Sequence, residues 1–268
     1  MKKMMSTELS NSEYHADPAI SKSGLDLVHK APAVYWDQKL NPRAEKHETP
    51  AMRLGSMIHM RVLERELFGS TYAHAPAVDR RTKAGKEAWQ SFIDANIGKQ
   101  IMTDDEGILV EKIGRAVDKS PIASSLLDGA EIESSFFWDD NGLACKCRAD
   151  AIRSDGVVID LKTTTDASPR GFLRSVMNFR YHVQAAYYLD GISRFQEANS
   201  FVLIAVEKTA PFLVGVYLMP QQLVDLGRHE YRKDLETFRQ CQAADQWPGL
   251  PDEIQVLDVP GWIDGSGD

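Results

Sequence analysis

The chain has 268 residues, 43% of them hydrophobic and 26% charged, and its formal net charge is −8 at pH 7. This length suits one large α/β domain, or one domain with a small appended part. The acidic balance excludes binding of nucleic acid through an overall positive charge, so any such binding must rest on local basic clusters and on metal ions.

The sequence also indicates where in the cell the protein acts and where its domain begins and ends. No apolar stretch approaches the ~20 residues that span a bilayer, and Met1 to Asn11 lacks the apolar run of a secretory signal. We therefore expect no membrane partner. Three cysteines cannot build a full disulfide framework, which favours reduced thiols in the cytoplasm. We expect a flexible segment over residues 1–20, one domain over 21–246, and a tail with proline and glycine over 247–268.

The first half of the chain is predicted to be helical. A short helix follows Ser23 and stops at Pro32, and a longer one over residues 50–67 has apolar residues at helical spacing. His59 lies one turn after Gly55 on that helix, and a lone histidine there is more often an interior residue than a ligand. Further helices are expected over residues 80–97, 104–119 and 121–127.

The densest basic cluster of the chain opens the helix over residues 80–97. Its members are Arg80, Arg81, Lys83 and Lys86, and Trp89 follows them. Either this cluster contacts nucleic-acid phosphates or it is the solvated start of a helix, and the sequence leaves both readings open.

After Gly129 the apolar pattern changes to period two, which predicts strands. Three of them form an antiparallel meander through the turns Asn141-Gly142 and Asp155-Gly156. The expected strands are 132–138, 143–153, 157–162, 201–206 and 212–218, with helices over 169–191 and 221–242. This order predicts an α/β (α+β) fold with a mixed central sheet and flanking helices.

The stretch from Arg148 to Lys162 carries the candidate chemistry. Asp150 lies near the end of one predicted strand, and Asp160 and Lys162 share one face of the next because strand side chains alternate. Two carboxylates and an ammonium are costly to bury without compensation, and a divalent cation would compensate them. The Leu161 carbonyl could add a third oxygen. Oxygen donors suit Mg²⁺, with Mn²⁺ as a possible substitute, and the chain lacks the spacing of a zinc site.

Three further motifs accompany Asp150: G-x-x-x-H from Gly55 to His59, D-L-K from Asp160 to Lys162, and Q-x-x-x-Y from Gln184 to Tyr188. In this order they resemble the PD-(D/E)xK nuclease superfamily. Within it the chain looks most like the RecE-type (exodeoxyribonuclease VIII) exonucleases of phage and prophage recombination, and more distantly like lambda exonuclease and the RecB nuclease domain. The resemblance spans about residues 21–218 and implies a restriction-endonuclease-like core.

The resemblance implies a role for each matching residue at the centre of the site. Asp150 and Asp160 would bind the metal together with the backbone carbonyl of Leu161. Lys162 would be the catalytic lysine, and His59 would approach a second metal, which raises it above its interior reading.

Residues around this centre are assigned in the same way. Gln184 and Tyr188 would lie beside the site as catalytic partners and touch the DNA strand. Ser21 and Ser23, in S-K-S-G-L, resemble a serine segment that holds a terminal 5′-phosphate. Glu133 is either an extra acidic ligand or a surface residue. The candidate contacts to DNA or its 5′-phosphate are Ser21, Ser23, Arg53, Arg80 and Arg81.

The resemblance also implies an activity and partners. It predicts a Mg²⁺-dependent exonuclease that degrades linear double-stranded DNA from 5′ to 3′ and leaves 3′ single-stranded overhangs for recombination by single-strand annealing. A ring-shaped homo-oligomer, a trimer or tetramer, and a single-strand annealing protein are the expected partners. The three cysteines do not match the pattern that binds an iron–sulfur cluster in some RecB-like members, so no cluster is expected.

Two other readings stay open at this stage. The chain could be a catalytically silent DNA-binding or assembly module of the same fold, although a decayed site would be expected to lose Asp150, Asp160 or Lys162. It could also be an endonuclease or a 3′-to-5′ nuclease of the superfamily.

Overall fold

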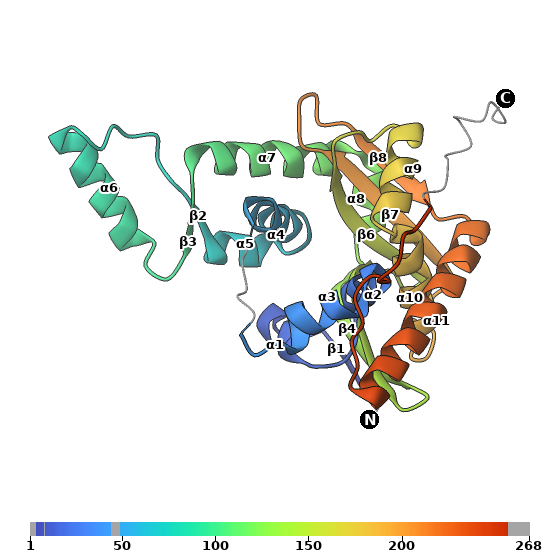
Figure 1. Ribbon diagram of the computed structural model, residues 1–268. Coiled ribbons are helices and arrows are strands. Elements are labelled where there is room, and N and C mark those ends of the chain that lie inside the picture. Colours follow the sequence, from blue (N-terminus) through green and yellow to red (C-terminus); the bar gives the residue numbers. More distant parts are fainter. Residues whose placement is uncertain (1–3, 8, 44–48, 257–268) are drawn as a thin grey trace.

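The computed structural model describes residues 4–7, 9–43 and 49–256. Its centre is a six-stranded sheet in the order β1-β4-β5-β6-β7-β8, in which β6 and β7 run parallel and the other neighbouring strands are antiparallel. The prediction of a mixed sheet with flanking helices is confirmed (Figure 1). The strands are β1 (Met4–Ser6), β4 (Glu131–Asp140), β5 (Leu143–Ile152), β6 (Val157–Thr164), β7 (Ser200–Glu207) and β8 (Val214–Leu218).

Helices cover both faces of the sheet and enclose two hydrophobic cores (Figure 1). Side chains alternate along β7, so Phe201 and Leu203 enter the first core and Val202 and Ile204 enter the second. The first core lies under α2 (Lys22–Lys30), α3 (Pro32–Tyr35), α9 (Pro169–Asn178), α10 (Tyr181–Ile192) and α11 (Gln221–Ala244). The second lies under α4 (Pro50–Leu63), α5 (Arg65–Thr71), α7 (Asp104–Lys119) and α8 (Pro121–Leu127).

Local sequence signals set several element boundaries where they were predicted. Helix α7 starts after Thr103, whose side chain accepts from the Glu106 backbone N–H while Glu106 accepts from the Thr103 N–H, a complete capping box. The β4–β5 hairpin turns at Asn141 and Gly142, with φ of 53° and 86°. Both residues occupy the left-handed region that a two-residue hairpin turn requires.

The helix predicted over residues 169–191 is in fact two helices. Arg180 lies between α9 and α10 with φ 54°, a left-handed conformation that no local glycine or proline demands. Its buried guanidinium pairs with Asp26 of α2 and with Glu230 and Asp234 of α11. These ion pairs come from tertiary structure, so helical periodicity could not reveal the break.

The expectation of a flexible segment over residues 1–20 needs correction for the part that the structure describes. Strand β1 pairs with β4, and α1 (Asn11–Ala16) is capped by Ser10. Tyr14 is buried and meets Phe137 edge to face. In the tail, Trp247 stacks on Tyr35, whereas residues 257–268 lie outside the described ranges.

An arm extends from the sheet and was only partly expected. We use "the arm" for residues 72–102, which contain β2 (Tyr72–His74), α6 (Lys83–Ala95) and β3 (Gln100–Met102). Strands β2 and β3 pair in parallel, and α6 lies farthest from the six-stranded sheet (Figure 1). A short π-helix, η1 (Trp36–Leu40), follows α3. Within the described ranges, none of the helices combines the length and apolar character that a bilayer crossing requires.

The close packing of α10 on α11 gives a stability prediction. A Cβ added at Gly227 of α11 would lie 2.1 Å from the His182 carbonyl oxygen of α10. Gly227→Ala should therefore destabilise the protein by about 1–3 kcal/mol, the usual cost of overpacking, measured by denaturant unfolding. Gly69→Ala is the control, because nothing lies within 4 Å of the added methyl in α5. Equal stability of the two variants would contradict the predicted helix contact.

Candidate active site

The site forms where β5 and β6 separate. These strands pair only at Ala151 with Ile159 and at Ile152 with Val158, whereas β6 pairs with β7 along its whole length. Beyond Ile159 the β5 backbone no longer reaches β6. The Leu161 N–H instead donates to Asp150 Oδ2 at 2.7 Å. A side-chain carboxylate thus replaces a backbone acceptor at the fork, which satisfies a donor that would otherwise be lost.

Asp160 and Lys162 lie on the side of β6 that faces α10. Asp160 is 2% exposed, and its two oxygens have different partners. The Lys162 ammonium lies 2.6 Å from Oδ2, and the Gln184 amide of α10 donates to Oδ1 at 2.5 Å. The structure therefore brings together Asp160, Lys162 and Gln184, three residues that sequence reasoning had grouped.

Tyr181 is a site residue that sequence reasoning missed. The Lys162 ammonium lies 4.8 Å from the centroid of its ring, on the face where a cation is attracted. Burial lowers the pKa of Lys162, but the carboxylates of Asp160 and Asp150 outweigh it and raise that pKa. Lys162 is therefore held as a cation. Tyr181 precedes Gln184 by one helical turn, so the spacing could have placed both on one face of α10.

A second set of groups meets Asp150 from the other side of the fork. Ligand atoms of His59, Glu133 and Asp150 lie within 4.8 Å of one another. The β4–β5 pairs Ile132–Ala151 and Ser134–Ala149 flank Glu133 and Asp150, which places these two acids opposite each other. Sequence reasoning left Glu133 open between ligand and surface residue, and the structure places it in the cluster.

The hairpin changes its packing at this pair of acids. In β4, Phe136 faces the first core but Ile132, four residues earlier, packs in the second. In β5, Ala149 faces the first core but Ala151, two residues later, packs in the second. Regular alternation would put residues an even number apart on the same face of a strand, and so in the same core. Glu133 has φ 52°, a left-handed conformation that is unusual for a residue with a side chain. The regular alternation of side chains is interrupted at this residue.

Burial, together with neighbouring negative charge, raises the pKa of both acids. Burial and the neighbouring charge of Asp150 raise the pKa of Glu133 to about 8. Burial and Asp160 raise the pKa of Asp150 to about 6. The Arg148 guanidinium lies 3.8 Å from Glu133 and offsets this only in part. When all three are ionised, the carboxylates of Glu133, Asp150 and Asp160 outnumber the neighbouring cations of Lys162 and Arg148.

The hydrogen bond of His59 indicates which ring nitrogen is free. Nε2 lies 2.8 Å from the Leu161 carbonyl oxygen, which can only accept, so Nε2 carries the proton. In a neutral imidazole Nδ1 then presents its lone pair toward Asp150 Oδ2 at 3.5 Å. The space above Gly55, one turn earlier, is open, because an added Cβ would meet nothing within 4 Å.

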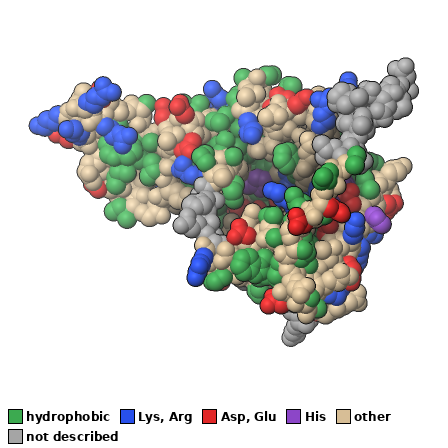
Figure 2. Space-filling view, viewed as in Figure 1, with side chains coloured by type: hydrophobic (Ala, Val, Ile, Leu, Met, Phe, Trp, Pro, Cys, Tyr) green, Lys and Arg blue, Asp and Glu red, His purple; other side chains and the backbone are tan. Residues whose placement is uncertain are grey.

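These residues fit a divalent cation. Asp150 and Glu133 offer carboxylate oxygens and His59 offers Nδ1, and the Leu161 carbonyl retains a second lone pair. Asp160 is not part of this cluster, because its two oxygens face Lys162 and Gln184. Oxygen-rich sets of this kind suit Mg²⁺ or Mn²⁺, and a positive ion would relieve the repulsion that raises the carboxyl pKa values. Figure 2 shows a hollow on this face of the molecule, with a histidine and a basic side chain inside it.

The predicted phosphate-binding serines lie at the start of α2, beside Tyr181. Ser21 caps α2 by accepting from the Gly24 N–H, and its hydroxyl lies 3.0 Å from that of Ser23. Lys22 lies between the two serines in the sequence, and its ammonium is 5.9 Å from the centroid of the Tyr181 ring. Lys22 and Lys162 therefore share one aromatic neighbour, which links the serine segment to the site.

The remaining predicted residues are three arginines that lie on other parts of the chain and Tyr188, whose pKa is raised by burial and, in smaller part, by charges that include Asp160 and Asp150. Arg53 pairs with Glu106 at 2.7 Å and donates to the Ile101 carbonyl, so it ties α4 to α7 and the arm. Arg80 packs over Trp89 and, with Arg81, is exposed in the loop before α6. Basic side chains gather at this outer end of the arm (Figure 2). Tyr188 is half-buried against Phe201, one turn after Gln184.

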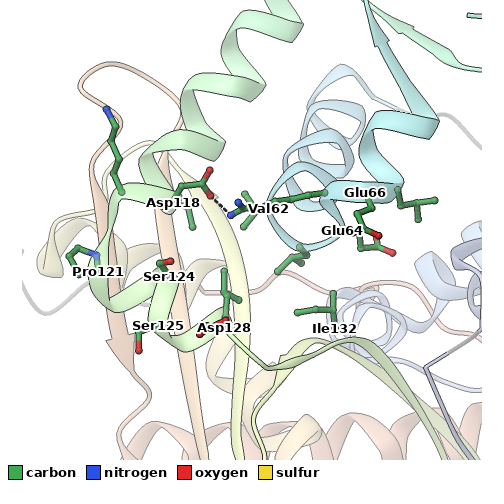
Figure 3. Close-up of a pocket in the computed structure, with 15 residues that line it drawn as sticks. Val62, Glu64, Glu66, Asp118, Pro121, Ser124, Ser125, Asp128 and Ile132 are labelled. Carbon is green, nitrogen blue, oxygen red and sulfur yellow. Dashed lines mark hydrogen bonds and ion pairs between the residues drawn. The ribbon is translucent and has the colours of Figure 1, made fainter.

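An acidic groove of about 980 Å³ adjoins the site between α5 and α8. Glu64, Glu66, Asp118 and Asp128 line it, against Arg65 and Lys119 (Figure 3). Asp118 pairs with Arg65 across the groove. The groove borders the site at Ile132, which lines the groove and directly precedes Glu133. A groove with this charge repels phosphates, so we do not place a nucleic-acid path through it.

A comparison with known protein families identifies the family of the chain. The model of a family described as "PDDEXK-like domain of unknown function (DUF3799)" matches residues 21–260. The chain belongs to this family. The PD-(D/E)xK resemblance is thereby confirmed at the level of the superfamily. No curated protein matches.

One solved structure shares the fold. The crystal structure of a "putative exonuclease" from Eubacterium rectale is similar with a TM-score of 0.65 at 14% identity, over 97% of this chain and 99% of that one. At this identity the likeness concerns the fold alone. A crystal structure of a protein named SSO0001 has a TM-score of 0.31 at 16% identity, over 69% of this chain and 85% of that one.

The raised carboxyl pKa values predict how stability depends on pH without metal. Glu133 holds a proton in the folded protein up to about pH 8 and loses it near its ordinary pKa of 4.5 when unfolded. The folded state therefore binds more protons between these values, and stability must fall as pH rises through that window. In EDTA, we expect the melting temperature to fall from pH 5 to pH 8.

The test compares two glutamates of β4 by thermal denaturation. Glu133→Gln should flatten the decline in EDTA, whereas Glu131→Gln, an exposed control, should keep it. Added Mg²⁺ should raise the melting temperature most at pH 8, where the acids are charged. A decline of the same size in Glu133→Gln would show that this acid does not carry the charge strain.

Proposed function

We propose that the protein is a Mg²⁺-dependent exonuclease that degrades linear double-stranded DNA from 5′ to 3′ and leaves 3′ overhangs for single-strand annealing. The observation that carries the proposal is the constellation at the β5–β6 fork in a chain of the PDDEXK-like family. Asp150 and Asp160 converge there with Lys162 held as a cation. An intact set of this kind favours an active enzyme over a silent module.

The residues of this chain have distinct parts in the proposed hydrolysis. A bound divalent cation would supply Lewis-acid stabilisation of the charge that grows on the phosphate oxygens. Lys162 would add a fixed positive charge beside the scissile phosphate, since Asp160 and Tyr181 hold its ammonium in place. Because its pKa is raised, Lys162 serves as a cation and not as a general base. Gln184 orients Asp160 through its amide.

The ends and backbone of the DNA would meet other parts of the chain. We assign the 5′-phosphate to the hydroxyls of Ser21 and Ser23, which lie at the N-terminus of α2, where a helix favours an anion. Arg80 and Arg81 would contact backbone phosphates from the arm, away from the cut. Arg53, if it contributes, would have to share its guanidinium with Glu106.

Assembly would solve the problem of net charge. In a ring of three or four subunits, the basic side chains of each arm could gather around one duplex, although each chain carries a formal charge of −8. Such a ring would keep the enzyme on its substrate and deliver the overhang to a single-strand annealing protein. The buried, unpaired thiols of Cys145, Cys147 and Cys241 suit a reducing cytoplasm, where we place this activity.

Digestion of end-labelled linear duplexes tests the proposal. With Mg²⁺, duplexes with a 5′-phosphate should lose a 5′-label as mononucleotides first, and a closed circle should stay intact. Asp160→Ala or EDTA should abolish cutting, while Asp105→Ala, an exposed acid of α7, should retain it. Cutting of the circle would indicate an endonuclease, early loss of the 3′-label would reverse the polarity, and activity in Asp160→Ala would remove the metal assignment.

His59→Ala tests whether the histidine serves the site or the core. Its ring is part-exposed and touches Asp150 and the Leu161 carbonyl, so its loss should leave the fold intact and lower kcat by about tenfold or more. The comparison is activity against melting temperature, with His74→Ala, in the arm, as control. An unfolded His59→Ala protein whose folded fraction keeps full activity would instead identify a core histidine.

A further inference from the structure

Phe179 is an aromatic residue that the fold leaves exposed beside the candidate site. It directly follows α9 and is 60% exposed. Two residues on the outer face of α9, Leu173 and Met177, are 50% and 39% exposed. Single exposed apolar residues are common, but a ring placed between a helix end and a charged site calls for a physical explanation.

The backbone holds Phe179 in a defined position. Its N–H donates to the Ser175 carbonyl at 2.9 Å, and its own carbonyl accepts from the Lys22 ammonium at 2.8 Å. The next residue, Arg180, has φ 54° and is held by carboxylates of α2 and α11. The residue is thus fixed on both sides although its ring faces solvent.

The Phe179 ring stacks on Tyr181, and Tyr181 in turn contacts the Lys162 ammonium. Phe179 and Tyr181 have centroids 5.7 Å apart with planes at 25°, a stacked arrangement. Tyr181 in turn lies 4.8 Å from the Lys162 ammonium. One face of Phe179 is therefore covered by Tyr181, and the stack ends in an aromatic surface open to solvent.

Charge on either side of the site favours a nucleic-acid strand on this surface. Arg170 and Arg174 are exposed on α9 at the same helical face as Leu173 and Met177. The acidic groove between α5 and α8 lies under the opposite core and repels phosphates (Figure 3). An exposed aromatic ring at the end of a helix that carries exposed arginines is the kind of surface that binds unpaired nucleotides, by stacking and by phosphate contacts.

We propose that Phe179 stacks on a nucleobase of the strand whose phosphodiester lies at Lys162. This inference rests on the proposed function for its substrate and adds a residue that positions it. Stacking on a preformed ring holds a nucleotide unstacked from its duplex neighbour and keeps its phosphate near the site. Because every base has a π-face, the contact would be tolerant of sequence.

Fluorescence of 2-aminopurine tests the contact without turnover. The base is placed either as an unpaired nucleotide at the 5′ end of a duplex, where it is largely unstacked, or ten pairs inside it, and the protein is added in EDTA. Stacking should quench the terminal probe and leave the internal probe unchanged. Phe179→Leu keeps apolar bulk without a π-face, and Phe179→Trp keeps the ring. Ile122→Ala is the control, an apolar residue of α8 that is 64% exposed.

We expect Phe179→Leu to lose the quenching and to bind the duplex end about tenfold more weakly or worse, from the ~1–3 kcal/mol of base–aromatic stacking. Phe179→Trp and Ile122→Ala should behave like the natural chain. Melting temperatures should be equal, because the Lys22 bond is to the backbone.

The outcomes separate this inference from the proposed function. Cleavage by the natural chain with unchanged quenching in Phe179→Leu would overturn the stacking contact and leave the nuclease in place. Loss of quenching in both Phe179→Leu and Phe179→Trp would also overturn it, since a ring would then not suffice. Quenching that depends on Phe179 in a chain that never cuts DNA would support the contact and reject the nuclease.

Discussion

A single hydrogen bond, from the Leu161 N–H to the Asp150 carboxylate, organises the site. Strands β5 and β6 pair over two residues and then part, so the β6 edge loses its backbone partner while β7 still holds its other edge. The carboxylate restores the lost acceptor and is fixed by it at 2.7 Å. The fork thus positions one acid, exposes the neighbouring carbonyl to His59, and leaves Asp160 facing α10.

Charge is the second constraint, and it follows from the first. Bringing Asp150, Asp160 and Glu133 to one fork concentrates negative charge in a buried place, which raises the pKa values of Asp150 and Glu133. The Lys162 ammonium neutralises part of that charge through its ion pair with Asp160, and it also contacts the Tyr181 ring. A divalent cation would complete the compensation, so the same repulsion that strains the metal-free site would favour metal binding.

The surroundings divide by charge in a way that the net charge conceals. Basic side chains gather on the arm and on the outer face of α9, whereas acids line the groove between α5 and α8. Arg180 connects this arrangement to the fold, because its buried ion pairs to α2 and α11 hold the left-handed joint that sets Phe179 and Tyr181 in place. The positions of both rings would therefore depend on ion pairs that join the start of α10 to α2 and α11.

Local sequence patterns were enough to predict the sheet and its turns and to single out Asp150 and Asp160. Period-two patterning with Asn141-Gly142 and Asp155-Gly156 predicted the meander within two residues at most ends, and the spacing from Asp150 to Lys162 predicted a metal site at its edge. Only the tertiary structure placed Glu133 in that site, Tyr181 beside Lys162, and the break at Arg180. Each depends on a left-handed backbone or on a contact between distant elements, and neither leaves a periodic trace in the sequence, since packing and buried ion pairs select such conformations against local preference.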